Sequence, residues 1–128
     1  MDKTPEQKWK ESIITFRKRC QQILNVSDSI RYVGVINEYG RTLTGMIKPG
    51  IKPLLTPERV KNEFFIISTL MSLRNEQAKT IGRLNYVLLE HEKVTLLAFQ
   101  DKNITYYISI DSKIKEIPKL VPLIKKII

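Results

Sequence analysis

The side chains with the most potential for chemistry are one histidine and its two acidic neighbours. His91 lies between Glu90 and Glu92, and groups of these types bind metal ions. A metal site needs three or four converging ligands, and the sequence identifies no others at ligand spacing. A solvated turn between two strands explains the same tripeptide, and we favour that interpretation.

The only cysteine, Cys20, lies on the apolar side of a predicted helix. Burial there raises the pKa of a thiol and lowers its reactivity, which favours a packing role. A single cysteine also excludes an internal disulfide and a zinc site built from cysteines. The glycines follow neither phosphate-loop spacing, GxGxxG or GxxxxGKS/T. We therefore expect no catalytic residues, no metal and no cofactor.

One group of residues has the chemistry of an anion site. Thr56 precedes a predicted helix, and the first N–H groups of a helix lack partners and attract phosphate or carboxylate. Lys48, Lys52 and Arg59 are close to Thr56 in the sequence. An ordinary capped helix after a proline-rich link is the simpler alternative.

The chain of 128 residues carries a formal charge of +9, from 22 Lys and Arg against 13 Asp and Glu. Such an excess attracts nucleic acids and anionic surfaces. The basic residues are spread along the sequence, which is typical of a solvated surface. The run Arg17–Arg19 leaves nucleic-acid binding open, and Trp9, Ile13 and Phe16 leave association with a membrane surface open.

Three segments have the features of helices. The first begins after Thr4, which forms a capping box with Gln7, and the second begins after Thr56. The third lies in the tail, where Pro118 and Pro122 make it short or kinked, or place its start near Pro118. Its apolar residues recur at helical spacing: Ile114, Ile117, Val121, Ile124 and Ile128.

Alternating apolar residues predict five strands. A hairpin spans 30–47, with Asn37–Gly40 as its turn, and three further strands span 83–89, 94–99 and 104–110. The element order predicts an α+β fold with a five-stranded antiparallel sheet and helices on its faces.

The expected domain is single, over residues 1–128, with a basic amphipathic helix over 1–27 and a core over 28–128. No apolar run reaches the roughly 20 residues that cross a bilayer, and the N-terminus has no apolar signal segment. We therefore expect a cytoplasmic protein.

The second predicted helix is apolar over more of its surface than one sheet face needs. One stripe is formed by Val60, Phe64, Ile67 and Met71, and a second by Ile66, Leu70 and Leu73, with Phe65 added. Either another element of the chain or another chain must cover the second stripe.

This element order resembles the roadblock / dynein-light-chain arrangement of the profilin-like fold, which is also similar to longin domains. The hairpin residues Val33–Ile36 and Tyr39–Arg41 look like the opening hairpin of that superfamily. A finer resemblance is to a group of small archaeal proteins of unassigned function. Its residues, within 28–127, are Met46, Gly50–Ile51, Pro53–Leu54 and Ile81–Tyr86.

The resemblance implies a non-enzymatic homodimeric adaptor or regulatory module that binds a protein partner, with a small GTPase among the partner classes. Mapped onto this chain, the implied interface consists of Phe64, Phe65, Ile67, Met71, Arg74, Leu84, Tyr86 and Leu88. Two alternatives stay open: a small-molecule-sensing profilin-like domain and a basic nucleic-acid-binding protein.

Overall fold

The computed structural model describes residues 2–113 and 117–128 and is built around one sheet. Its five antiparallel strands follow the order β2-β1-β5-β4-β3. The strands are β1 (Ile30–Ile36), β2 (Thr42–Ile47), β3 (Val87–Glu90), β4 (Val94–Asp101) and β5 (Ile104–Asp111). The predicted α+β class and five-stranded antiparallel sheet are confirmed.

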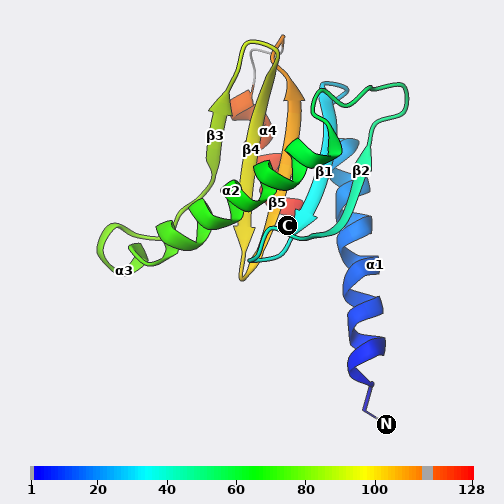
Figure 1. The fold of residues 1–128 in the computed structure, drawn as a ribbon, viewed down its shortest axis with the longest axis vertical. Coiled ribbons are helices and arrows are strands. Elements are labelled where there is room, and N and C mark those ends of the chain that lie inside the picture. The colour runs from blue at the N-terminus through cyan, green and yellow to red at the C-terminus, as the bar shows by residue number, and fades with distance from the viewer. Residues whose placement is uncertain (1, 114–116) are drawn as a thin grey trace.

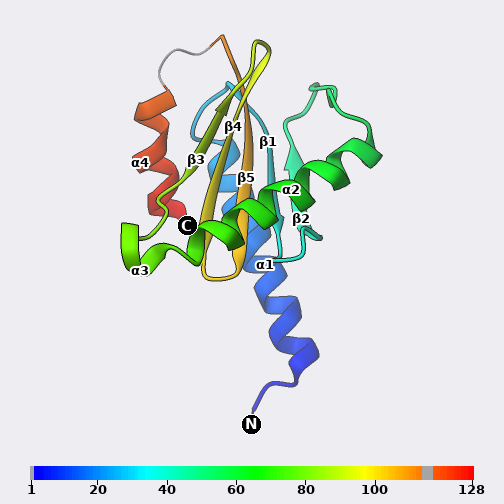
Figure 2. The same cartoon turned by 60° about the vertical axis from the view of Figure 1, so that its left-hand side comes forward.

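Within the described residues, four helices accompany the sheet: α1 (Pro5–Leu24), α2 (Pro57–Asn75), α3 (Ala78–Ile81) and α4 (Ile117–Ile127). Two of them, α1 and α4, pack on one face of the sheet, and α2 crosses the opposite face diagonally (Figures 1 and 2). The sheet is therefore the middle of three layers. Within the described part of the chain, no helix is both long and apolar enough to span a bilayer.

The helix starts follow the predicted capping chemistry. Gln7 N donates to Thr4 Oγ1 at 3.1 Å, and Thr4 N donates to Gln7 Oε1 at 2.9 Å, which completes the capping box of α1. At α2, Arg59 N donates to Thr56 Oγ1 at 3.3 Å. The last helix begins at Ile117, one residue before Pro118, as its prolines predict. Ile114 lies outside the described residues.

The core between the sheet and α1 and α4 includes Cys20 and Ile23, both with no exposed surface. Phe16 packs edge-on against Tyr106, whose hydroxyl oxygen accepts a 2.8 Å hydrogen bond from Arg19 Nη1. Only the C-terminal part of α1 lies against the sheet, because its N-terminal turns extend past the sheet's end (Figure 1). Trp9, in the N-terminal half of α1, is accordingly 53% exposed.

The core between the sheet and α2 is centred on three aromatic rings. Phe64 meets Tyr107 edge-on at a centroid distance of 4.9 Å and stacks with Tyr32 at 6.4 Å. The Tyr32 ring covers two glycines, Gly34 and Gly45, which face each other on β1 and β2. A large side chain on β1 thus fills the space that the two glycines leave open.

Candidate functional site

One apolar stripe of α2 is buried against the sheet, and the other is exposed to solvent. Phe64, Ile67 and Met71 are at most 2% exposed and pack against the chain's own sheet. Each residue along a helix is rotated by about 100° from the one before, and Phe65 and Ile66, one and two positions after Phe64, turn away from the sheet and are exposed. The prediction that Phe64, Ile67 and Met71 meet another chain therefore needs correction, since they are already buried within their own.

The solvent side of α2 is apolar instead. Phe65, Ile66 and Leu73 are 62%, 60% and 54% exposed, and we call these three residues the outer face of α2. Exposed apolar residues that gather on one side of an element mark interaction sites more often than single ones do. Of the predicted interface residues on this helix, Phe65 and the exposed Arg74 remain available to a partner.

The strand beside this helix is the free edge β3, and it is shorter than the predicted strand over 83–89. Val87 and Leu89 belong with the core under α2. Leu88, 41% exposed, points to the other face, because successive strand side chains alternate. Tyr86 also lies on that side and packs 5.7 Å from the ring of Phe99.

This arrangement corrects the predicted grouping on the strand. The alternation of a strand over 83–89 would place Leu84, Tyr86 and Leu88 on one face, yet Leu84 packs with the core under α2. The alternation breaks because the residues just before Val87 are not in a strand. Both faces of this edge therefore present apolar residues near the end of α2.

Three of the predicted residues do meet around one hollow. Arg74, Leu84 and Tyr86 line a space of about 330 Å³, together with the short helix α3 and the segment that leads to β3. Arg83 also lines it, so two arginines and no acidic residue are among the residues that border the hollow. Such a lining suits a partner's carboxylate or phosphate group.

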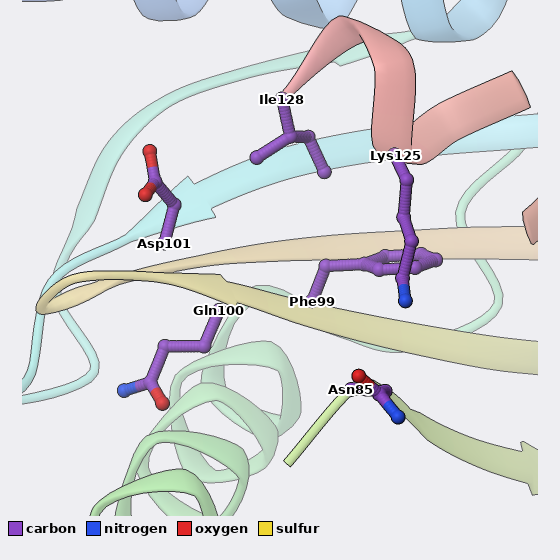
Figure 3. A pocket seen from close by; sticks show the side chains of 6 residues that line it. All are labelled: Asn85, Phe99, Gln100, Asp101, Lys125 and Ile128. Carbon is purple, nitrogen blue, oxygen red and sulfur yellow. The ribbon is translucent and has the colours of Figure 1, made fainter. Parts of the chain in front are cut away.

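A second, smaller hollow of about 210 Å³ lies between β4 and the C-terminal helix α4. Figure 3 shows Lys125 reaching from α4 toward Asn85, with Gln100 and Asp101 on the opposite side. Its volume is below the roughly 300–1,000 Å³ of typical small-molecule sites. The larger hollow, at about 330 Å³, falls just inside this range, so the small-molecule-sensing alternative stays open.

Two residues of the predicted anion site, Lys48 and Thr56, use their side chains in other contacts. Lys48 Nζ donates to the carbonyl oxygen of Ser27 at 2.7 Å, which ties this side chain to the loop before β1. Thr56 Oγ1 serves as the cap of α2, and Lys52 offers its carbonyl oxygen to Arg31 Nη2 at 3.0 Å. The anion site at Lys48, Lys52, Thr56 and Arg59 stays a prediction without support from these contacts.

The cysteine and the histidine, the other candidates for chemistry, lie in surroundings that fit structural roles. Cys20 is fully buried, and this burial raises the pKa of its thiol to about 11. His91 is exposed in the turn between β3 and β4. Over residues 2–113 and 117–128, no three His, Cys, Asp or Glu side chains cluster closely enough to hold a metal.

Three exposed apolar residues in this region were not among the predicted interface residues. Ile66 and Leu73 belong to the second stripe, and the signal that could have found them was the helical phase relative to Phe64. Ile81, 64% exposed, lies on α3 and borders the larger hollow. A helix of four residues is too short for periodicity to reveal it.

The fold defined here, an antiparallel sheet with one helix crossing one face and two helices on the other, is that of roadblock domains. A roadblock/LC7 domain from Streptomyces avermitilis superposes with a TM-score of 0.59 and 12% identity, over 85% of this chain and 93% of that one.

Two proteins named MglB superpose more fully. The gliding protein MglB from Thermus thermophilus gives a TM-score of 0.69 at 14% identity, covering 89% of this chain and 82% of that chain. MglB from Myxococcus xanthus gives 0.67 at 13% identity, covering 91% and 83%. No family model and no curated protein matches the sequence. The finer resemblance to small archaeal proteins stays a prediction.

Proposed function

We propose that this chain is a single roadblock-like domain that pairs with a second copy of itself and serves as a non-enzymatic adaptor for a protein partner. The observation that carries the proposal is the outer face of α2, where Phe65, Ile66 and Leu73 are each more than half exposed. Full burial of such a side chain contributes about 1.5–3 kcal/mol. In a two-fold symmetric dimer both copies present the same surface, so each interface residue is buried once in each copy and contributes twice.

The neighbouring edge strand supports this pairing. A free edge such as β3 presents unpaired N–H and C=O groups that can continue the sheet into another chain. Because β3 lies beside the end of α2, one partner copy can cover the outer face of α2 and the strand edge together (Figure 2). Of the predicted interface residues, Phe65 and Arg74 are exposed on α2, and Tyr86 and Leu88 are exposed on the other side of the same sheet edge.

For the protein partner, we propose a small GTPase, the class that the resemblance to roadblock proteins implies. The likeness in fold to the MglB structures supports an interaction module, and a third MglB structure, similar at a TM-score of 0.68 and 16% identity, is described as having a tetrameric arrangement. The hollow bordered by Arg74 and Arg83 offers two basic groups for an acidic group of such a partner.

Light scattering across a range of micromolar concentrations tests self-association. We expect wild type to approach the mass of a dimer and Phe65→Glu to stay monomeric, because the substitution places a charge in the apolar contact. Leu123→Glu is the matched control, since Leu123 is also an exposed helical residue, at 47%, but lies on α4. A monomeric wild type, or a dimer that Phe65→Glu leaves intact, would contradict the proposed pairing.

Nucleotide-dependent binding tests the partner class. Small GTPases from the same organism, loaded with GDP or a non-hydrolysable GTP analogue, are passed over immobilised wild type and Phe65→Glu. Retention that depends on the nucleotide supports the proposed class. Binding of none of them in either state contradicts a GTPase partner and leaves the self-association result unaffected.

A further inference from the structure

The helices α1 and α4 form a second surface on the opposite side of the molecule. They pack side by side over one core, which includes Ile23 from α1 and Leu120, Val121 and Ile124 from α4 (Figures 1 and 2). Since these buried sides face the sheet together, the outer sides of both helices face the solvent together. We call this surface the α1/α4 face.

Most of the protein's net positive charge lies on the two helices that form this face, although the guanidinium of Arg19 points inward and donates to Tyr106. Five basic and two acidic side chains occur in α1, and α4 has three basic and no acidic ones. The two helices thus contribute +6 of the formal charge of +9. By contrast, α2 on the other face has three basic residues against two acidic ones. Charges that are spread along the sequence are therefore concentrated by the fold.

Exposed aliphatic residues lie among these charged side chains. Ile14 on α1 is 66% exposed, and Lys10 and Lys18 lie one helical turn before and after it. Leu123 on α4 is 47% exposed, and Lys126 lies one turn after it. Each helix therefore presents the same pattern, an aliphatic side chain with lysine beside it on the solvent side.

We propose that the α1/α4 face binds an anionic membrane surface, with lysines at the lipid headgroups and Ile14 and Leu123 inserted shallowly. Anionic bilayers attract clustered basic residues, and aliphatic side chains among them add burial at the acyl boundary. Single-stranded nucleic acid is bound by aromatic side chains that stack on bases, whereas the side chains at these two positions are aliphatic. The face lies opposite to α2, so membrane binding leaves the outer face of α2 accessible.

Cosedimentation with vesicles tests this inference. The full chain is mixed with vesicles of phosphatidylcholine alone or of phosphatidylcholine with phosphatidylserine, at low and at physiological salt. We expect binding only to the vesicles with phosphatidylserine and weaker binding at the higher salt, because salt screens the attraction. No binding to phosphatidylserine vesicles at low salt, or equal binding to both kinds of vesicle, would overturn the inference.

Two double variants with the same change in charge locate the surface. Lys18→Gln with Lys126→Gln removes two charges from the α1/α4 face and should weaken vesicle binding by about 30-fold. Lys61→Gln with Lys93→Gln removes two exposed charges from α2 and the β3–β4 turn and should weaken it far less. Equal weakening by both pairs would show that only net charge matters and would overturn the proposed surface.

A third double variant tests insertion. Ile14→Ser with Leu123→Ser keeps the charge and should weaken vesicle binding by about tenfold, because less apolar surface leaves water. Binding of wild type and of the same variants to a DNA duplex is measured in parallel, because a duplex is the alternative polyanion. If wild type binds the duplex but not the vesicles, or if the serine substitutions leave vesicle binding unchanged, the membrane assignment fails.

Discussion

At the scale of residues, one glycine sets how closely the hairpin turn approaches α2. Gly40 has a φ of +82°, and a Cβ atom added there would lie 2.8 Å from the Cα atom of Phe65. Backbone atoms of a helix cannot move aside as the end of a flexible side chain can. The turn was predictable from Asn37–Gly40, but its contact with α2 was not, because that contact joins distant parts of the sequence.

Substitution of Gly40 by alanine should therefore lower the free energy of unfolding by about 2–3 kcal/mol, from backbone strain and from the clash. Gly50 provides the control, since its φ is also +82° but an added Cβ there would have no neighbour within 4 Å. We expect Gly50→Ala to cost only about 1 kcal/mol. Equal losses in urea unfolding of the two variants would contradict the close packing of the turn on α2.

The buried thiol of Cys20 and the buried tyrosine hydroxyls predict that the free energy of unfolding falls at alkaline pH. Burial raises the pKa of Cys20 from 9.0 to about 11 and that of Tyr32 from 10.0 to about 12. Burial also raises the pKa values of Tyr106 and Tyr107. The folded state thus keeps protons that the unfolded state has lost, so stability is full below about pH 9 and falls as the pH rises toward 12.

Urea unfolding at about pH 7, 9 and 10.5 measures this decline. A shift of about two pKa units corresponds to about 3 kcal/mol in full, most of it lost by about pH 10.5, and Cys20→Ala should flatten part of the slope. Stability that stays constant over this whole range would contradict the burial of these groups.

At the scale of elements, the sequence identified α2 and its start but not its orientation. Both stripes of the helix are apolar, so their composition gives no reason for Phe64 rather than Phe65 to face the sheet. The choice is made by the fit of Phe64 against Tyr32 and Tyr107, which come from β1 and β5. Such contacts lie far apart in the sequence, and periodicity carries no information about them.

The adjacent pair of phenylalanines tests this orientation. Phe64→Ala should lower the free energy of unfolding by about 3–5 kcal/mol, because it leaves a cavity in the core. Phe65→Ala should change it by at most about 0.5 kcal/mol when the protein is dilute and monomeric. Chemical unfolding at low concentration measures both, and a larger loss for Phe65→Ala would reverse the assigned faces.

The segment between α2 and β3 was the least predictable. Its alternation suggested a strand from Arg83, but Gly82 adopts a φ of +90° and the strand begins only at Val87. Strand β3 pairs with β4 alone, so fewer contacts fix its limits than fix those of the inner strands. The predicted interface residues Leu84, Tyr86 and Leu88 consequently divide between the two sides of the edge.

At the scale of the whole molecule, the two faces differ in chemistry. The outer face of α2 is apolar, while the α1/α4 face is basic with isolated aliphatic residues. The sequence predicted the elements that form the three layers, because each has its own periodicity. It did not predict the gathering of charge, because the lysines and arginines of α1 and α4 are separated by most of the chain.

The central claim is that a second copy covers the outer face of α2 and the edge of β3. Amide hydrogen exchange of wild type at low and high protein concentration measures this directly. We predict that protection rises with concentration in α2 and β3 and stays unchanged in α1 and α4. Protection that does not depend on concentration, or that rises elsewhere in the chain, would contradict the account.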